Sequence, residues 1–181
     1  MNVWGRAGKQ VRKYYTLKRL LELFRGKVMR KKKQIYIAGP LFSEHERKFL
    51  EEIVEKLVRN VGLDPQKDIF LPHRDAGEIG IHGERREEMF STDLKFLDNA
   101  TIVVALLDGP DIDSGTAVEL GYAFGRSKEI FGILTDWRRW SHTEQKVENI
   151  NNMIWGVCGK GKRIYRRIDD KLIEDVRKCL R

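Results

Sequence analysis

Cysteine is almost absent from this chain of 181 residues, which contains only Cys158 and Cys179. The two are isolated, so the sequence has neither a disulfide framework nor the paired spacing of a zinc site. Its four histidines are scattered and also lack the spacing of metal ligands. We therefore expect no metal site and interpret both thiols as buried or incidental.

Long apolar runs and phosphate-binding glycine motifs are missing as well. No run approaches the ~18 apolar residues of a membrane span, and the N-terminus has no apolar signal segment, which predicts a cytoplasmic protein without a membrane partner. The sequence contains no Gly-x-x-x-x-Gly-Lys-Ser/Thr loop, and no Gly-x-Gly-x-x-Gly follows a predicted strand. These absences argue against nucleoside triphosphate and nicotinamide chemistry, and we expect no cofactor.

The positive charge of the chain is concentrated at one end. The formal net charge is +8, yet residues 1–33 hold twelve Lys or Arg and one Glu, while the other 148 residues hold 23 basic and 26 acidic groups. Basic tails can bind nucleic acid or acidic surfaces. Because the body of the protein is slightly acidic, we favour a solvated extension, or a helix docked on a neighbouring subunit, over a nucleic-acid interface. Apolar residues at helical spacing over 14–29 predict that this basic N-terminal extension is helical.

From Gln34 to the C-terminus the sequence predicts one α/β domain. With 41% apolar residues the chain can form an ordinary core. Apolar strand patterns alternate with amphipathic helix patterns, which is typical of a three-layer sandwich around a five-stranded, mainly parallel sheet. Strands are predicted at 35–38, 69–71, 102–107, 129–134 and, at an edge, 163–168; helices at 43–60, 84–99, 114–126 and 169–180.

The remaining segments are less regular. The stretch from Pro72 to Gly83 is polar and contains glycine, 136–142 is interpreted as a loop, and 143–155 is weakly helical. Ser43 and Glu46 have the spacing of a capping box at the start of the first helix of the domain.

The stretch from Asp108 to Phe124 is the most informative part of the chain. It follows the apolar run 102–107, which is typical of a buried parallel strand, and turns through glycine, proline and aspartates into a helix near Ser114. This order places acids at the carboxyl edge of the sheet, where open α/β folds bind ligands. Glu119 is the single carboxylate on a helix of small residues, where its desolvation is costly unless it is functional. Glu119 is therefore the leading candidate for a reactive residue.

A second acid, Asp93, is predicted to border a buried face. Phe90, Leu94 and Leu97 are expected to face the core, and Asp93 lies four residues before Leu97. A partly buried Asp facing a partly buried Glu suits acid/base chemistry, because their mutual repulsion separates the two pKa values. From spacing alone, Asp93 is equally well interpreted as a turn cap or as the partner of an arginine.

Three blocks of sequence, in register, resemble the nucleoside 2-deoxyribosyltransferase family. They are Tyr36-Ile-Ala-Gly-Pro-Leu-Phe42, Asp93-Leu94 and Asp113-Ser-Gly-Thr-Ala-Val-Glu-Leu-Gly-Tyr122, and the likeness runs from about Ile35 to Trp155. The segment 72–83 matches poorly, and residues 1–33 have no counterpart. The resemblance implies a flavodoxin-like fold and an enzyme that cleaves the N-glycosidic bond of 2′-deoxynucleosides and passes the sugar to a free nucleobase.

The resemblance also implies roles for individual residues. Glu119 would attack the anomeric carbon and form a covalent deoxyribosyl-enzyme, Asp93 would exchange a proton with the base, and Tyr36 would orient Glu119. Substrate-binding positions carried over from the matching motifs are Ala38, Gly39, Phe42, Asp113, Gly115 and Asn151. Asp113 matches the position that holds the sugar 5′-hydroxyl, and Asn151 matches an asparagine that reaches the 5′-hydroxyl in a neighbouring subunit, which implies a homo-oligomer.

Other functions remain open at this point. The chain also resembles 2′-deoxynucleoside 5′-phosphate N-hydrolases, but these have small hydroxyl residues around the phosphate. The anionic Asp113 would repel a phosphate and accept a bond from a hydroxyl instead. A nucleotide-binding module without turnover has no need of the set Tyr36, Asp93 and Glu119. Asn151 has an alternative interpretation as an ordinary helix-end or turn asparagine.

Overall fold

The computed structural model describes residues 34–76, 86–141 and 146–181. The basic extension predicted over 1–33, with its predicted helix at 14–29, lies outside the described residues, and so does most of the polar stretch between Pro72 and Gly83.

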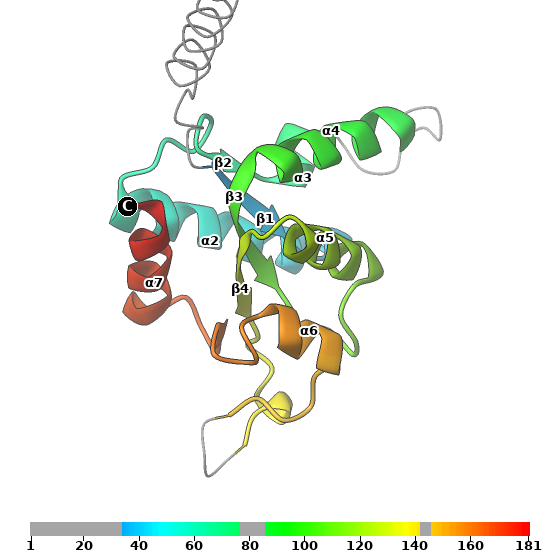
Figure 1. Ribbon diagram of the computed structural model, residues 1–181, viewed down its shortest axis with the longest axis vertical. Coiled ribbons are helices and arrows are strands. Elements are labelled where there is room, and N and C mark those ends of the chain that lie inside the picture. The colour runs from blue at the N-terminus through cyan, green and yellow to red at the C-terminus, as the bar shows by residue number, and fades with distance from the viewer. Residues whose placement is uncertain (1–33, 77–85, 142–145) are drawn as a thin grey trace, which may run out of the picture. The chain divides into compact units, whose positions relative to one another are not determined.

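A five-stranded sheet forms the centre of the domain (Figure 1). Its strands occur in the order β2-β1-β3-β4-β5, and all neighbouring pairs are parallel, so the sheet is wholly parallel rather than mainly so. This is the flavodoxin-like order, in which the chain reverses its direction of winding between β1 and β3 and leaves a crevice at their carboxyl ends. The strands are β1 (Gln34–Ala38), β2 (Ile69–Phe70), β3 (Ala100–Leu106), β4 (Glu129–Ile133) and β5 (Ile164–Tyr165).

Helices cover both faces of this sheet, which confirms the predicted three-layer α/β architecture. Helices α2 (Glu44–Val61) and α7 (Asp170–Leu180) lie on one face; α4 (Arg86–Asn99), α5 (Ser114–Gly125) and α6 (Asn152–Val157) lie on the other (Figure 1). Side chains alternate between the two faces along β1: Ile35 and Ile37 belong to the core under α2 and α7, and Tyr36 and Ala38 to the other core. The alternation is what directs Tyr36 toward α5.

The helix ends follow their local sequence. The capping box predicted for Ser43 and Glu46 is present, with the Ser43 backbone N–H donating to Glu46 Oε2 at 2.7 Å. Gly62 ends α2 in the left-handed region at φ 79°, which a residue with a side chain adopts at a cost. Asp169 caps α7 by accepting a bond from the Leu172 N–H.

Two local predictions are wrong, and one segment for which no element was predicted forms a helix. Pro72–Asp75 forms a short helix, α3, because proline suits a first helical turn and the Asp75 carboxylate accepts a bond from the Leu71 N–H. Helix α6 begins only at Asn152, since Val147 pairs with Trp140 in a β-bridge and Asn151 caps the helix. Phe90 is 66% exposed, whereas Leu97 is buried, so only the C-terminal part of α4 packs on the core.

The helices of the described ranges give no membrane-spanning candidate: each of them is too short or too polar to cross a bilayer.

Candidate active site

Tyr36 of β1 and Glu119 of α5 are in direct contact. The Tyr36 hydroxyl donates a hydrogen bond of 2.6 Å to Glu119 Oε1. Tyr36 is fully buried on β1, and its ring packs against Phe70 with 5.3 Å between ring centroids. Phe70 in turn stacks on Phe96 of α4 at 3.9 Å. The contact with Phe70 and the hydrogen bond to Glu119 together hold the Tyr36 side chain in place, and Glu119 has one defined donor.

Asp93 lies on α4 near the same two side chains. Its negative charge acts on both the Tyr36 hydroxyl and the Glu119 carboxyl. Its Oδ1 is buried and has no hydrogen-bond partner among the described residues. Within those residues this oxygen has neither of the partners that spacing left open, a backbone N–H to cap or an arginine, which favours a group that awaits a proton or a ligand.

Burial dominates the electrostatics of this group. Removal from water raises the pKa of Glu119 to about 8, the Tyr36 hydrogen bond opposes that rise, and the charges of Asp93 and Asp113 add to it. Burial also raises the pKa of Asp93 to about 6. The pKa of Tyr36 is strongly raised, first by burial and then by the two carboxylates. Between those two values Glu119 and Asp93 together hold one proton, and these values place it mainly on Glu119. A nucleophile at Glu119 and an acid at Asp93 require the form in which that proton has moved to Asp93 and Glu119 is ionised.

Strand β1 ends two residues beyond Tyr36, and a turn follows it. Ala38 is buried at the end of the strand. A Cβ on Gly39 would lie 2.8 Å from Leu50 Cδ2 and 3.1 Å from Leu106 Cβ, so a side chain here would require these two residues to shift. Phe42, three residues on, is 73% exposed and available for contact with a ligand.

Asp113 stands at the start of α5, the helix that carries Glu119. Its Oδ2 accepts bonds from the Thr116 N–H at 2.8 Å and from the Thr116 hydroxyl at 3.0 Å, so this oxygen caps the helix. A Cβ added to Gly115 would lie 3.1 Å from the same oxygen. Only Oδ1 of Asp113 is therefore left for a ligand, and Gly115 keeps the approach to the carboxylate open.

Two residues that sequence reasoning did not single out fix the loop between β3 and α5. Asp108 accepts bonds from the Thr135 N–H at 2.6 Å and from the Thr135 hydroxyl, which ties the end of β3 to the end of β4. Arg139 donates to the carbonyls of Gly109 and Pro110 and, at 2.6 Å, of Asn149. The signal was present in the sequence, because Asp108 and Thr135 each directly follow an apolar strand.

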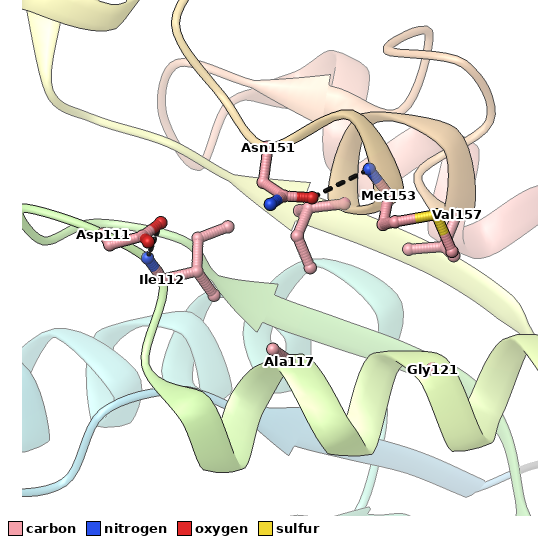
Figure 2. A pocket seen from close by; sticks show the side chains of 8 residues that line it. Asp111, Ile112, Ala117, Gly121, Asn151, Met153 and Val157 are labelled. Carbon is pink, nitrogen blue, oxygen red and sulfur yellow. Dashed lines mark hydrogen bonds between the residues drawn. The ribbon is translucent and has the colours of Figure 1, made fainter.

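Asn151 lies apart from the Glu119 group. Its Oδ1 caps α6 by accepting a bond from the Met153 N–H at 2.9 Å, as the helix-end interpretation predicts. Figure 2 shows it beside a pocket of about 350 Å³ that is also lined by Asp111 and by Ala117 and Gly121 of α5. Glu119 is two residues from each of these α5 positions, or about 200° around the helix. Asn151 and Glu119 of one chain therefore lie on opposite faces of α5.

Within residues 34–76, 86–141 and 146–181, no cluster of three or more His, Cys, Asp or Glu side chains is arranged to hold a metal ion.

Comparison with known proteins identifies the family of this chain. The sequence profile of the family described as nucleoside 2-deoxyribosyltransferase matches residues 35–154. The chain belongs to the nucleoside 2-deoxyribosyltransferase family. It is thus a member of a family of enzymes that act on glycosidic bonds, and the matched range contains Tyr36, Asp93 and Glu119.

Individual members of the family, and one protein without an assigned role, are similar over most of their length. An uncharacterized protein of Ureaplasma parvum is 30% identical over 141 residues, covering 72% of this chain and 88% of its own. The nucleoside deoxyribosyltransferase of Lactobacillus leichmannii is 26% identical over 136 residues, covering 70% and 81%. The solved 2-deoxyribosyltransferase of Bacillus psychrosaccharolyticus is 26% identical with a TM-score of 0.55, covering 80% of this chain and 90% of that one. Each of these three likenesses covers 70% or more of this chain.

Proposed function

We propose that the protein is a nucleoside 2-deoxyribosyltransferase that moves 2-deoxyribose from a 2′-deoxynucleoside to a free nucleobase. The observation that carries the proposal is the Tyr36 hydroxyl held 2.6 Å from Glu119 Oε1, with Asp93 close enough to influence both groups. In this geometry one carboxylate is oriented as a nucleophile while a second is available for proton transfer.

In the first half of the proposed reaction, a Glu119 oxygen attacks the anomeric carbon of the deoxynucleoside. The N-glycosidic bond breaks with its electron pair going to the base, and the base nitrogen takes the proton of Asp93. The product is a deoxyribosyl ester on Glu119. Negative charge beside the sugar stabilises the oxocarbenium-like transition state. The Tyr36 hydrogen bond holds the attacking carboxylate in one orientation.

In the second half, Asp93 removes a proton from an incoming base, whose nitrogen attacks the anomeric carbon and releases the Glu119 carboxylate. Asp113 Oδ1 is the oxygen that remains to accept a bond from the sugar 5′-hydroxyl, since Oδ2 is engaged with Thr116. An anion at this point disfavours a 5′-phosphate, which argues for an unphosphorylated substrate.

The test of the proposal is incubation with deoxyinosine and free adenine, followed by separation of the products. Transfer gives deoxyadenosine and hypoxanthine in equal amounts. Hypoxanthine with free deoxyribose, without deoxyadenosine, would identify a hydrolase instead. No reaction with this pair or with pyrimidine deoxynucleosides would leave a binding module as the better description.

The pH dependence of kcat/KM should be bell-shaped, with its maximum between about 6 and 8. Below this window both carboxyls are protonated, and Glu119 lacks the charge to attack. Above it both are ionised, and no proton is available for the departing base. The two limbs belong to the Glu119–Asp93 pair as a whole. Initial rates of deoxyinosine cleavage across pH 4 to 10 measure the profile; a single limb would contradict a shared proton.

We further propose that the working enzyme is a homo-oligomer in which Asn151 completes the site of a neighbouring subunit. Within one chain Asn151 is separated from Glu119 by α5. Beside it, Val118 and Met153 are more than two-thirds exposed, as apolar residues at an interface are in a separated subunit.

Mixing two inactive variants tests this sharing of the site. Glu119→Gln removes the proposed nucleophile, and Asn151→Ala is expected to lower kcat/KM by about 10-fold to 100-fold, as the loss of a bond to a substrate hydroxyl does. After dissociation and reassembly of a mixture, hybrid interfaces contain sites with both residues intact, so activity should return. Activity in the mixture equal to the average of the two variants would show that each chain builds its own site.

A further inference from the structure

A second cavity lies at the carboxyl ends of β4 and β5, outside the Glu119 group. Its volume of about 580 Å³ is within the range of roughly 300–1,000 Å³ that is usual for pockets that hold small molecules. Helix α2 contributes Glu52 and Lys56, and α7 contributes Lys171. The segments that follow the two strands contribute Trp137 and Arg166. We call this cavity the Trp137–Arg166 groove.

Arg166 is held in the groove by aromatic rings rather than by carboxylates. Its guanidinium carbon lies 4.1 Å from the centre of the Trp137 ring and 5.1 Å from that of Trp140. Its Nε is buried and has no hydrogen-bond partner in the part of the chain that the structure describes. A buried donor without an acceptor is costly, so the geometry favours a ligand that supplies one.

The acids of the groove are already engaged, which leaves a surplus of positive charge. Glu52 pairs with Lys56 at 3.2 Å. Asp169 caps α7 and lies 3.7 Å from Arg167 Nε. Lys171, an exposed residue, has its ammonium 5.8 Å from the centre of the Tyr165 ring and forms no ion pair within the described ranges.

The carboxylate of Asp175, which interacts electrostatically with Lys171, is itself bonded to other groups. Asp175, one turn further along α7, accepts the Tyr165 hydroxyl at 2.8 Å and lies 3.2 Å from Lys178. Arg166 and Lys171 thus remain as two cations without a bonded anion, at one cavity.

We propose that the Trp137–Arg166 groove binds a nucleoside monophosphate, with the phosphate on Arg166 and Lys171 and the base stacked on Trp137. A phosphate dianion supplies the acceptor that Arg166 Nε lacks and matches the fork of a guanidinium. The Trp137 indole is 65% exposed and gives a base a flat apolar surface. The groove is distinct from the catalytic group, where three carboxylates disfavour phosphate.

Calorimetric titration of the full-length protein tests the assignment, with adenosine 5′-monophosphate, adenosine and inorganic phosphate as separate probes. Arg166→Gln and the exposed Lys171→Gln should each weaken binding of the monophosphate by about 10-fold or more. Trp137→Ala should weaken the monophosphate but leave inorganic phosphate unchanged. The matched control is Arg138→Gln, which alters an arginine of the same loop that is 88% exposed and paired with Asp136 at 2.7 Å; it should leave all three affinities unchanged.

The outcomes that overturn the proposal are equally definite. A phosphate site is excluded if Lys171→Gln and a folded Arg166→Gln protein both bind the monophosphate as tightly as the wild type does. It is also excluded if adenosine binds through the same residues as tightly as the monophosphate. If inorganic phosphate and the monophosphate bind with equal affinity, and Trp137→Ala changes neither affinity, the groove does not recognise the nucleoside part of the ligand. Because the assay measures binding, a protein that transferred no sugar would still test the groove.

Discussion

Replacing Glu119 with glutamine should abolish deoxyribosyl transfer, with a fall in kcat/KM of roughly 10⁴-fold or more, the size of effect that follows removal of a nucleophile. Glutamine keeps the shape of the side chain and an oxygen for the Tyr36 hydroxyl, so the loss would be chemical rather than structural. The covalent step has its own readout. Wild-type protein mixed with a deoxynucleoside and no acceptor base should gain the mass of one deoxyribosyl group, and the variant should not.

A stability measurement supplies the control for this variant. The pKa of Glu119 is raised in the folded state from an ordinary value of 4.5 to about 8, so ionising it costs stability. That cost begins as the pH rises above 4.5 and is complete above about 8. Glu119→Gln should therefore melt at a higher temperature than the wild type at pH 9 and at nearly the same temperature at pH 4. An inactive variant with a lowered melting temperature at both pH values would point to misfolding instead.

Replacing Asp93 with asparagine should lower kcat/KM for deoxyinosine by about 10²-fold to 10⁴-fold, the usual contribution of an acid/base group. Asparagine cannot protonate the departing base. The alkaline limb of the pH profile should disappear as well, because it reports loss of that proton. With the Asp93 charge gone, the pKa of Glu119 should fall, since this charge is one of the causes that raise it.

The choice of substrate separates this role from a structural one. 7-Methyl-2′-deoxyinosine carries a positive charge on its base, which leaves as a neutral molecule without taking a proton. Asp93→Asn should therefore cleave it at a rate close to that of the wild type. Glu87→Gln alters an exposed carboxylate on the same helix and serves as the matched control. A variant equally slow on both substrates would exclude Asp93 as the acid.

The sequence was most informative where a local pattern coincides with the tertiary arrangement. The apolar run before Asp108 is a central parallel strand. Such strands are easily recognised in a sequence, because both of their faces are buried and their residues form a continuous apolar run. Glu119 stood out because it is the single carboxylate among small residues on its helix. The pairing of Tyr36 with Glu119 came only from the family resemblance, since no local pattern links residues 83 positions apart.

Where the prediction was wrong, tertiary contacts overrode the local pattern. Phe90 lies at the helical spacing of a core residue, yet its side chain is exposed. Spacing along a helix does not show how much of that helix the sheet covers. The sequence over 143–155 has a weak helical pattern, but Val147 instead forms a β-bridge with Trp140. The helix begins only after Asn151, which caps it. The Trp137–Arg166 groove was not predictable because its walls come from four separate elements, each ordinary when taken alone.

Asp113 caps α5 and is also the proposed partner of the sugar 5′-hydroxyl, which bears on how such enzymes diverge. One of its oxygens caps α5, and serine caps a helix about as well as aspartate does. If Asp113 contacts the sugar as proposed, a change at this position would alter that contact while the helix that carries Glu119 keeps its start. Selection can explore new specificities here without first acquiring compensating changes elsewhere in the protein.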